Sequence, residues 1–301
     1  MGYPIVTFGE LSNGIEADVA GALATLGADV IFVSTTPGDP AEDETVRRLR
    51  ALHVNTEFVV EEPGGLPAID PIVFDWDEIL ADAGWVYLNG LTPGHSEAGA
   101  AMTLAAAQAA NREELTVFYD LSFRKHLWNW RPGMAPRELA NAATRRILPF
   151  VDVVIASAED ILQLVRPAEA VATLNLDACC NLAAKLAEEF PNIMTVVILL
   201  RERAADGSAR LGAMLYDVDS LMAYLAPLNE AMEITPYEVP ADADLNVSDA
   251  AFSAGAVYAL TTVGLDQGPR AIGFAAAMTN LRLSQQGEGY PTRAEVEAKL
   301  T

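Results

Sequence analysis

Short apolar runs alternate with longer amphipathic segments along this chain. Residues 5–8 form the first apolar run; in residues 18–26 apolar side chains recur every three or four positions, and a second run follows at 30–34. A short apolar run predicts a buried strand, whereas recurrence every three or four residues predicts a helix. The order strand, helix, strand is the unit from which parallel sheets are built.

The same alternation continues to the end of the chain. Further strands are predicted at 56–60, 85–88, 116–119, 151–156 and 195–200, with an antiparallel edge at 213–216 and near Tyr224. Further helices are predicted at 43–52, 76–83, 96–110, 136–148, 158–165, 176–189, 252–262, 268–283 and 293–300, the last with Thr292 as its N-cap. We therefore predict a single α/β domain over residues 1–301, a doubly wound, mostly parallel sheet with helices on both faces.

The amino-acid composition argues against several kinds of partner and site. The 19 Lys and Arg residues face 42 Asp and Glu residues, a formal net charge of −23. Such a surface repels phosphate backbones and anionic lipids, so we expect neither a nucleic-acid partner nor a membrane. The adjacent Cys179 and Cys180 suit a reduced helix interior better than a disulfide or a metal site. We expect a cytoplasmic protein with no metal in its structure.

Polar side chains gather where the predicted parallel strands end, the edge at which such sheets bind ligands. They are Asn13, Asn89, Asp120, Arg124, Ser157, Arg201 and the loop 244–250. From this loop the stretch 244–255 runs into an apolar helix, and a helix N-terminus offers free N–H groups to an anion. The loop itself contains no glycine that would let the backbone approach a phosphate closely.

Several short motifs carry a family resemblance. They are Val6-Thr-Phe-Gly-Glu10, Phe74-Asp-Trp-Asp-Glu78, Gly90-Leu-Thr-Pro93, Tyr119-Asp-Leu-Ser-Phe-Arg-Lys-His-Leu-Trp128, Ile155-Ala-Ser-Ala-Glu-Asp160, Leu199-Leu-Arg-Glu202 and Ala213-Met-Leu-Tyr-Asp217. In order and spacing, along nearly the whole chain, they resemble the ribokinase-like (PfkB) carbohydrate kinases, most closely the bacterial 2-keto-3-deoxygluconate kinases.

The resemblance implies a large α/β domain, a small β-sheet lid over the sugar, and transfer of the γ-phosphoryl group of ATP to a sugar hydroxyl. In the family an Asp in a Gly-Ala-Gly-Asp-like motif accepts the proton, and glycine amides stabilise the transferring charge. The resemblance places Gly14, Asp18 and Arg124 at substrate-binding positions. It places Arg201 on the nucleotide side, together with Ser157 and Asp160, which correspond to residues that help position Mg²⁺.

The catalytic motif departs from the family pattern. The family's Asp-x-x-Gly-x-Gly-Asp-x-Phe-x-Ala-Gly keeps its last anchors at 252–255, but its glycines fall on Val247 and Asp249 and its base falls on Ala250. Alanine cannot accept a proton, and losing such a base costs ~10²–10⁴-fold in rate. A carboxylate at Asp249 would also repel phosphate. A one-residue shift of frame would make Asp249 the base, but the helix register would have to shift with it.

The lid is also predicted to be absent. In the family a long segment separates the first Gly-Glu from the Gly-Gly that opens the first helix, whereas here Glu10 is followed almost directly by residues 12–14. A second lid segment should lie between the strand near Val59 and the helix at Trp76, where only the Pro/Gly-rich stretch 61–71 is present. A lid excludes water and completes a site, so its loss would change the chemistry.

Simpler interpretations compete for several of these residues. Asp120 and Arg124 could pair with each other instead of binding substrate. For Arg201 and Glu202 a surface ion pair is favoured over a nucleotide contact. The acidic residues at 242, 244 and 249 lack the spacing of a cation-binding loop, so no metal ligand is assigned.

These observations favour a kinase homologue that has lost phosphoryl transfer, a pseudokinase acting by binding or scaffolding. The alternative is an active ATP-dependent sugar or sugar-acid kinase that uses Asp249 as a shifted base, with ATP and Mg²⁺ as cofactors. A third possibility is a protein that binds a sugar acid through Gly14, Asp18 and Arg124 and acts as a sensor. A protein partner or a second copy of the chain could occupy the surface that a lid would cover.

Overall fold

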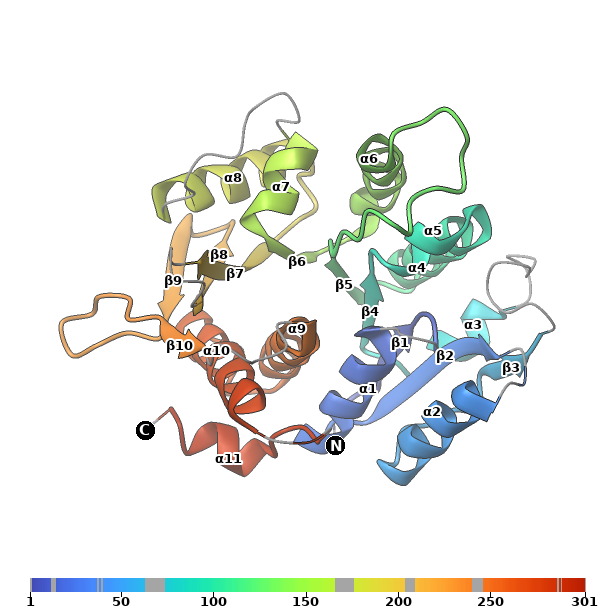
Figure 1. The fold of residues 1–301 in the computed structure, drawn as a ribbon, viewed down its shortest axis with the longest axis horizontal. Coiled ribbons are helices and arrows are strands. Elements are labelled where there is room, and N and C mark those ends of the chain that lie inside the picture. The colour runs from blue at the N-terminus through green and yellow to red at the C-terminus, as the bar shows by residue number, and fades with distance from the viewer. Residues whose placement is uncertain are drawn as a thin grey trace.

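Parallel strands form most of one sheet that runs across the protein (Figure 1). The computed structural model describes residues 2–11, 15–36, 38, 40–62, 74–165, 176–203, 209–239, 246–285, 287 and 289–300. Its strands are β1 Ile5–Phe8, β2 Val30–Thr36, β3 Val59–Glu61, β4 Trp85–Asn89, β5 Thr116–Asp120, β6 Val153–Ser157, β7 Thr195–Arg203, β8 Ala209–Asp217, β9 Met222–Ala226 and β10 Tyr237–Val239. They form one ten-stranded sheet in the order β10-β8-β7-β6-β5-β4-β1-β2-β3, with β9 also paired to β8.

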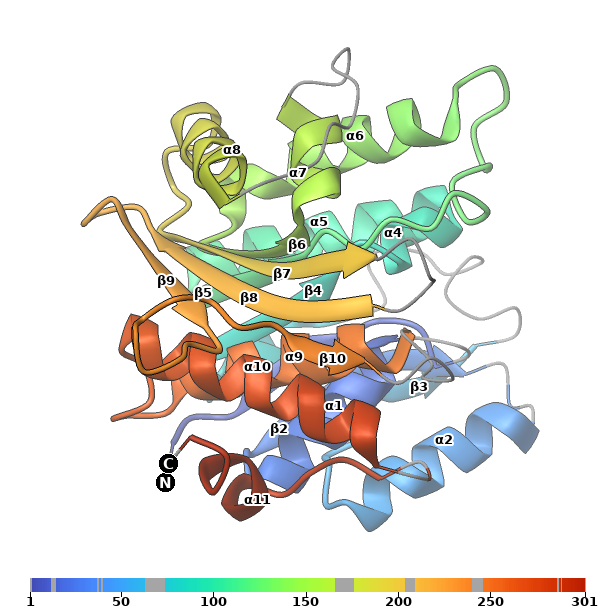
Figure 2. The same cartoon turned by 60° about the vertical axis from the view of Figure 1, so that its left-hand side comes forward.

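Helices cover both faces of this sheet (Figures 1 and 2). They are α1 Ile15–Leu26, α2 Pro40–Ala51, α3 Trp76–Leu80, α4 Thr92–His95, α5 Glu97–Arg112, α6 Pro136–Ile147, α7 Ala158–Val165, α8 Leu176–Glu189, α9 Asn246–Thr261, α10 Gly268–Ser284 and α11 Arg293–Glu297. A 3₁₀ turn, Leu148–Phe150, follows α6. Helices α1, α2, α9, α10 and α11 lie on one face and α4 to α8 on the other.

Successive strand residues enter two separate apolar cores. In β5, Phe118 packs with the cluster that contains α1, α9 and α10, whereas Val117 and Tyr119 pack with the cluster that contains α5, α7 and α8. Side chains alternate across a strand, so a sheet covered on both faces needs apolar residues at every position. That requirement explains why the strands read as unbroken apolar runs.

The predicted fold class is confirmed: the sheet is mostly parallel, and β8 and β9 form the predicted antiparallel edge. The bounds of β1, α7 and α8 are as predicted. The predicted starts of three helices are wrong, since α1 begins at Ile15, α2 at Pro40 and α9 at Asn246, not at 18, 43 and 252. The first turns of these helices carry polar residues, which hide the apolar period. Helix α4 and strand β10 were not predicted.

The predicted N-cap of α11 is confirmed, because Thr292 and Glu295 form a reciprocal capping box. Among the described residues, none of the helices has both the length and the apolarity to cross a membrane. Residues 12–14 and 63–73, in the stretches where the family has its lid, lie outside the described residues. The absence of a lid therefore stays a prediction.

Candidate functional site

The carboxyl ends of β1, β4 and β5 meet at the point where the strand order reverses. Chain order runs from β1 through β2 to β3 on one side, and the chain then returns to place β4 on the other side of β1. Open α/β sheets bind ligands at such a switch point. Buried polar side chains gather at these ends, namely Glu16, Asn89, Thr92, Asp120, Ser122 and Ser253.

Asp120 is the most heavily hydrogen-bonded acid of this group. Its Oδ1 accepts the backbone N–H of Ser122 at 3.0 Å and the Ser122 hydroxyl at 2.7 Å. Its Oδ2 accepts the hydroxyl of Ser253 at 2.7 Å and that of Tyr87 at 3.3 Å. Burial raises the pKa of Asp120, and the hydrogen bonds from Ser122 and Ser253 oppose the rise. The alternative that Asp120 pairs with Arg124 is wrong, because donors on β4, on α9 and in the segment just after β5 satisfy the carboxylate.

Glu16, which the sequence reasoning did not single out, lies beside this cluster. Its side chain is 0% exposed, and Oε1 accepts the hydroxyl of Thr92 at 2.6 Å. Among the described residues no group hydrogen-bonds to Oε2. Burial raises the pKa of Glu16 to about 7. A Cβ added at Gly9 would lie 2.3 Å from Cγ of Glu16, so only glycine after β1 leaves room for this side chain.

The sequence did contain a signal for Glu16. Positions 16, 19, 20 and 23 follow helical spacing, and Val19, Ala20 and Leu23 are all fully buried. Extending that apolar face by one turn toward the N-terminus reaches Glu16. The signal was missed because the predicted helix began at residue 18, after the acid.

Asp249 is held between two arginines, one from the segment after β5 and one from β7. Its Oδ2 accepts a hydrogen bond from Nη2 of Arg124 at 2.9 Å, and its Oδ1 forms an ion pair with Nη2 of Arg201. The same Nη2 of Arg201 donates to the hydroxyl of Ser248 at 2.8 Å. Arg124 follows β5 and Arg201 lies in β7, so Asp249 on α9 joins two separated strand ends. Arg201 and Glu202, for which an ion pair is the favoured interpretation, do each form one, but not with each other: Arg201 pairs with Asp249, and Glu202 pairs with Arg210 of β8 at 3.1 Å.

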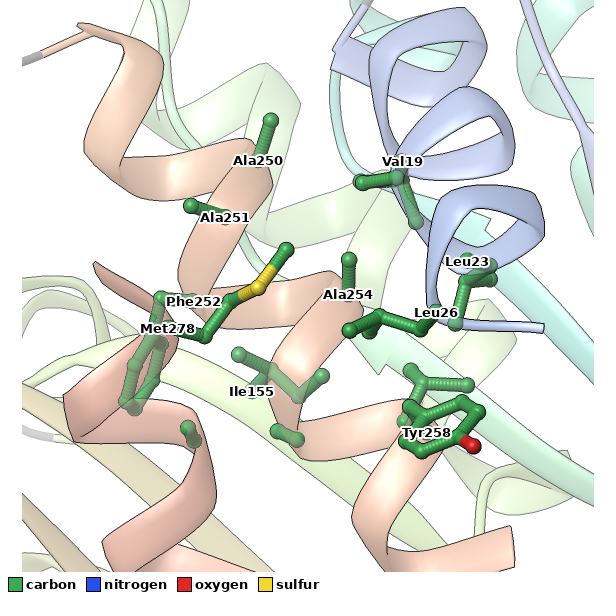
Figure 3. Packing of buried hydrophobic residues seen from close by; sticks show 14 of the residues in the cluster. Val19, Leu23, Leu26, Ile155, Ala250, Ala251, Phe252, Ala254, Tyr258 and Met278 are labelled. Carbon is green, nitrogen blue, oxygen red and sulfur yellow. The ribbon is translucent and has the colours of Figure 1, made fainter. Parts of the chain in front are cut away.

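Ala250, at the expected position of the base, points into the apolar core. It is 1% exposed and belongs to the cluster that contains Val19 of α1. Figure 3 shows Ala250 and Val19 on the neighbouring helices α9 and α1. Phe252 and Ala254, which anchor the family pattern, are buried in the same cluster. The helix therefore presents a methyl group where the resemblance places a carboxylate.

The other residues assigned to substrate binding are dispersed. Asp18 forms a 2.8 Å ion pair with Arg48 of α2, and both side chains are partly exposed. Arg124 contacts Asp249 instead of Asp18. Gly14 lies outside the described residues. The described part of the chain thus brings Arg124 together with Asp249 and Arg201, but does not bring Asp18 to them.

Ser157 and Asp160 form a local pair at the start of α7. The Ser157 hydroxyl donates to Oδ2 of Asp160 at 2.9 Å and accepts the backbone N–H of Asp160 at 3.1 Å. Nη1 of Arg137 donates to Oδ1 of Asp160 at 2.9 Å, and this guanidinium also lies 3.5 Å from the ring centre of Phe123. Both carboxylate oxygens of Asp160 are therefore occupied by protein donors. Within the described ranges, no group of three or more His, Cys, Asp or Glu side chains is arranged to hold a metal ion.

Comparison with known proteins agrees with this architecture. No family model matches the chain. The 2-dehydro-3-deoxygalactonokinase of Haloferax volcanii is 29% identical over 230 residues, which is 68% of this chain and 66%, just under two thirds, of that relative. The solved 2-dehydro-3-deoxygluconokinase of Thermotoga maritima superposes with a TM-score of 0.83 at 24% identity, covering 100% of this chain and 98% of the other.

A solved PfkB family carbohydrate kinase from Listeria grayi gives a TM-score of 0.79 at 18% identity, over 99% of this chain and 100% of the other. The chain thus has the fold of the ribokinase-like (PfkB) carbohydrate kinases, and over two thirds of its length its sequence is similar to that of a 2-dehydro-3-deoxygalactonokinase.

Proposed function

We propose that this kinase homologue no longer transfers a phosphoryl group and acts instead by binding. The observation that carries the proposal is Ala250, a buried methyl group where the family resemblance places the proton acceptor. A side chain without a lone pair cannot serve as a general base, and that loss alone costs ~10²–10⁴-fold in rate.

The neighbouring acid is a poor substitute in its present position. Both oxygens of Asp249 are engaged by guanidinium groups, one from Arg124 and one from Arg201. A substrate hydroxyl would have to displace an arginine before it could reach either oxygen. Proton transfer requires the base within hydrogen-bond reach of the reacting group, and this geometry keeps that place filled.

The described donor set also fits Mg·ATP poorly. Magnesium is held by carboxylate oxygens together with phosphate oxygens and water. Asp160 has both oxygens bonded to Arg137 and Ser157, and Asp249 adds a negative charge at the start of α9, where phosphate would lie. No step of a reaction is therefore assigned to a nucleotide or a metal ion.

The second candidate function is an active sugar or sugar-acid kinase that uses Asp249. One observation favours it, namely that Asp249 is only 14% exposed and lies beside Arg124, a cation suited to bidentate recognition of a carboxylate. In that case a sugar acid would draw Arg124 away from Asp249 and free an oxygen for proton transfer. Relatives named for 2-dehydro-3-deoxy sugar-acid kinase activity make this class of substrate the one to test first.

An assay for ADP formation from Mg·ATP separates the two candidates. The unmodified chain is incubated with 2-keto-3-deoxygluconate or 2-keto-3-deoxygalactonate, beside Asp249→Asn purified in the same way. We expect both proteins to give the same background rate and calorimetry to detect no Mg·ATP binding tighter than roughly 1 mM. Turnover in the unmodified chain that disappears in Asp249→Asn would overturn the proposal and establish the active kinase.

A binding role also needs a partner. The surface that a lid would cover in the family is the place where we propose that a protein partner or a second copy of the chain binds. A small sugar acid at Arg124 is the ligand that the family resemblance favours. The cysteines Cys179 and Cys180 are free thiols, which fits a reducing cytoplasmic setting.

A further inference from the structure

Two guanidinium groups converge on one carboxylate at the start of α9. Arg124 reaches Asp249 from the segment after β5, and Arg201 reaches it from β7. Besides Asp249, the described hydrogen bonds of these two side chains go to neutral oxygens: the carbonyl of Phe123 at 3.4 Å and the hydroxyl of Ser248 at 2.8 Å. Asp249 is thus the only acid with which either arginine forms an ion pair in the described part of the chain.

All three side chains remain within reach of solvent. The exposed fractions are 32% for Arg124, 33% for Arg201 and 14% for Asp249. An arginine carries five N–H donors in a planar fork, so each guanidinium keeps donors that Asp249 does not use. A pair of arginines that converge in this way is the donor set that proteins use to bind a carboxylate or phosphate group.

We propose that Asp249 is an internal occupant of an anion-binding site formed by Arg124, Arg201 and Ser248, and that an external anion binds there by displacing it. The ligand class is a small molecule that presents a carboxylate or a phosphate group. This inference deepens the proposed binding function, because it names the ligand chemistry and the contact that restrains binding. The site would be autoinhibited by a residue of its own chain.

Occupancy of the arginines by Asp249 weakens the binding of an external anion. The apparent affinity for that anion is the affinity of the open site multiplied by the fraction of molecules in which the site is open. If Asp249 occupies the arginines about 99% of the time, an external anion binds about 100-fold more weakly than the two arginines alone would allow. Because the acid is already part of helix α9, it competes at a high effective concentration that does not depend on the protein concentration.

The test is a calorimetric titration of inorganic phosphate at constant ionic strength and without nucleotide. It compares the unmodified chain with Asp249→Asn, with Asp249→Ser as a second, smaller replacement in case the first folds poorly. Asp82→Asn is the matched control, because it removes one negative charge from an exposed loop far from the two arginines in sequence. Gluconate replaces phosphate in a second arm, to separate phosphate from carboxylate recognition.

We expect Asp249→Asn or Asp249→Ser to bind one of the two anions at least about 10-fold more tightly than the unmodified chain, and Asp82→Asn to match the unmodified chain. Adding Arg201→Gln to the Asp249 variant should remove the gain. Equal affinities in the Asp249 and Asp82 variants would overturn the inference, as would a gain that survives Arg201→Gln. The assay contains no nucleotide, so its failure is distinct from the finding of kinase turnover that would overturn the proposed function.

Discussion

Thr92 donates its hydroxyl hydrogen to Oε1 of Glu16 over 2.6 Å, while no described group hydrogen-bonds to Oε2. The two residues come from segments 76 positions apart and meet beside the carboxyl ends of β1 and β4. A fully buried carboxyl with one bonded oxygen is more stable protonated than charged, which is why burial raises the pKa of Glu16 to about 7.

The raised pKa of Glu16 determines how the free energy of unfolding changes with pH. Between its ordinary value of 4.5 and about 7 the folded chain holds a proton that the unfolded chain has lost. The free energy of unfolding therefore falls as pH rises through this range, by about 3 kcal/mol from Glu16 alone. Burial raises the pKa of Asp120 as well, which adds a loss of the same sign.

Replacing Glu16 by Gln should remove the part of this pH-dependent loss of stability that Glu16 causes. The amide keeps an oxygen for Thr92 and carries no charge, so urea unfolding at pH 5 and pH 8 should differ by about 3 kcal/mol less in Glu16→Gln than in the unmodified chain. The exposed Glu113→Gln serves as the control and should leave the difference between the two pH values unchanged. An unchanged pH difference in Glu16→Gln would show that the acid is hydrated in solution.

Ala250→Asp is expected to destabilise the chain by about 3 kcal/mol, because its carboxylate would enter the apolar cluster beside Val19. Burial would raise the folded-state pKa of the new acid, so the destabilisation should be larger at pH 8 than at pH 4. Ala142→Asp, on an exposed position of α6, is the control for the helix propensity of Asp. Urea unfolding measures both variants.

The same Ala250→Asp protein also tests what catalysis would need. We expect no ADP formation from Mg·ATP and 2-keto-3-deoxygluconate, since Asp249 still occupies both arginines. Turnover in this variant would mean that the missing base was the sole barrier. Stability equal to that of Ala142→Asp would contradict the burial of position 250.

Arg137→Ala should lower the free energy of unfolding by about 2 kcal/mol. The guanidinium lies 3.5 Å from the ring centre of Phe123 and bonds Asp160, so its loss removes a cation–π contact and leaves a partly buried carboxylate short of a donor. Arg112→Ala is the matched control, because the side chains of the Arg112–Asp77 pair are 61% and 76% exposed and such pairs contribute about 0.5 kcal/mol. Equal midpoints in urea unfolding would contradict the assigned role of Arg137.

Local sequence patterns were sufficient for most of the fold. The strand at Ile5–Phe8 and the helices α7 and α8 could be predicted because each has one uninterrupted apolar pattern with clear ends. The starts of α1 and α9 could not, because Glu16 and Ser248 are polar residues on buried faces. Strand β10 has three residues, too few to show a pattern of its own, and it is defined by its pairing with β8, which precedes β9 in the chain.

The site was less accessible to sequence reasoning, because its partners are remote along the chain. Arg124 and Asp249 are separated by 125 positions and Asp120 and Ser253 by 133, so no local spacing reveals either contact. Residue types alone allowed Asp120 to pair with Arg124, which is nearer in sequence. The fold instead turns Asp120 toward hydroxyl donors and leaves Arg124 for the acid on α9.

The hydrogen bond from Ser253 to Asp120 fixes the rotation of helix α9 about its own axis. Sliding α9 by one residue would turn it by about 100°, which would pull Ser253 off the buried carboxylate and swing Phe252 out of the core. Asp249 therefore cannot trade places with Ala250 by a change of register. Any chemistry or binding at Asp249 therefore takes place from the position that this residue holds in the structure.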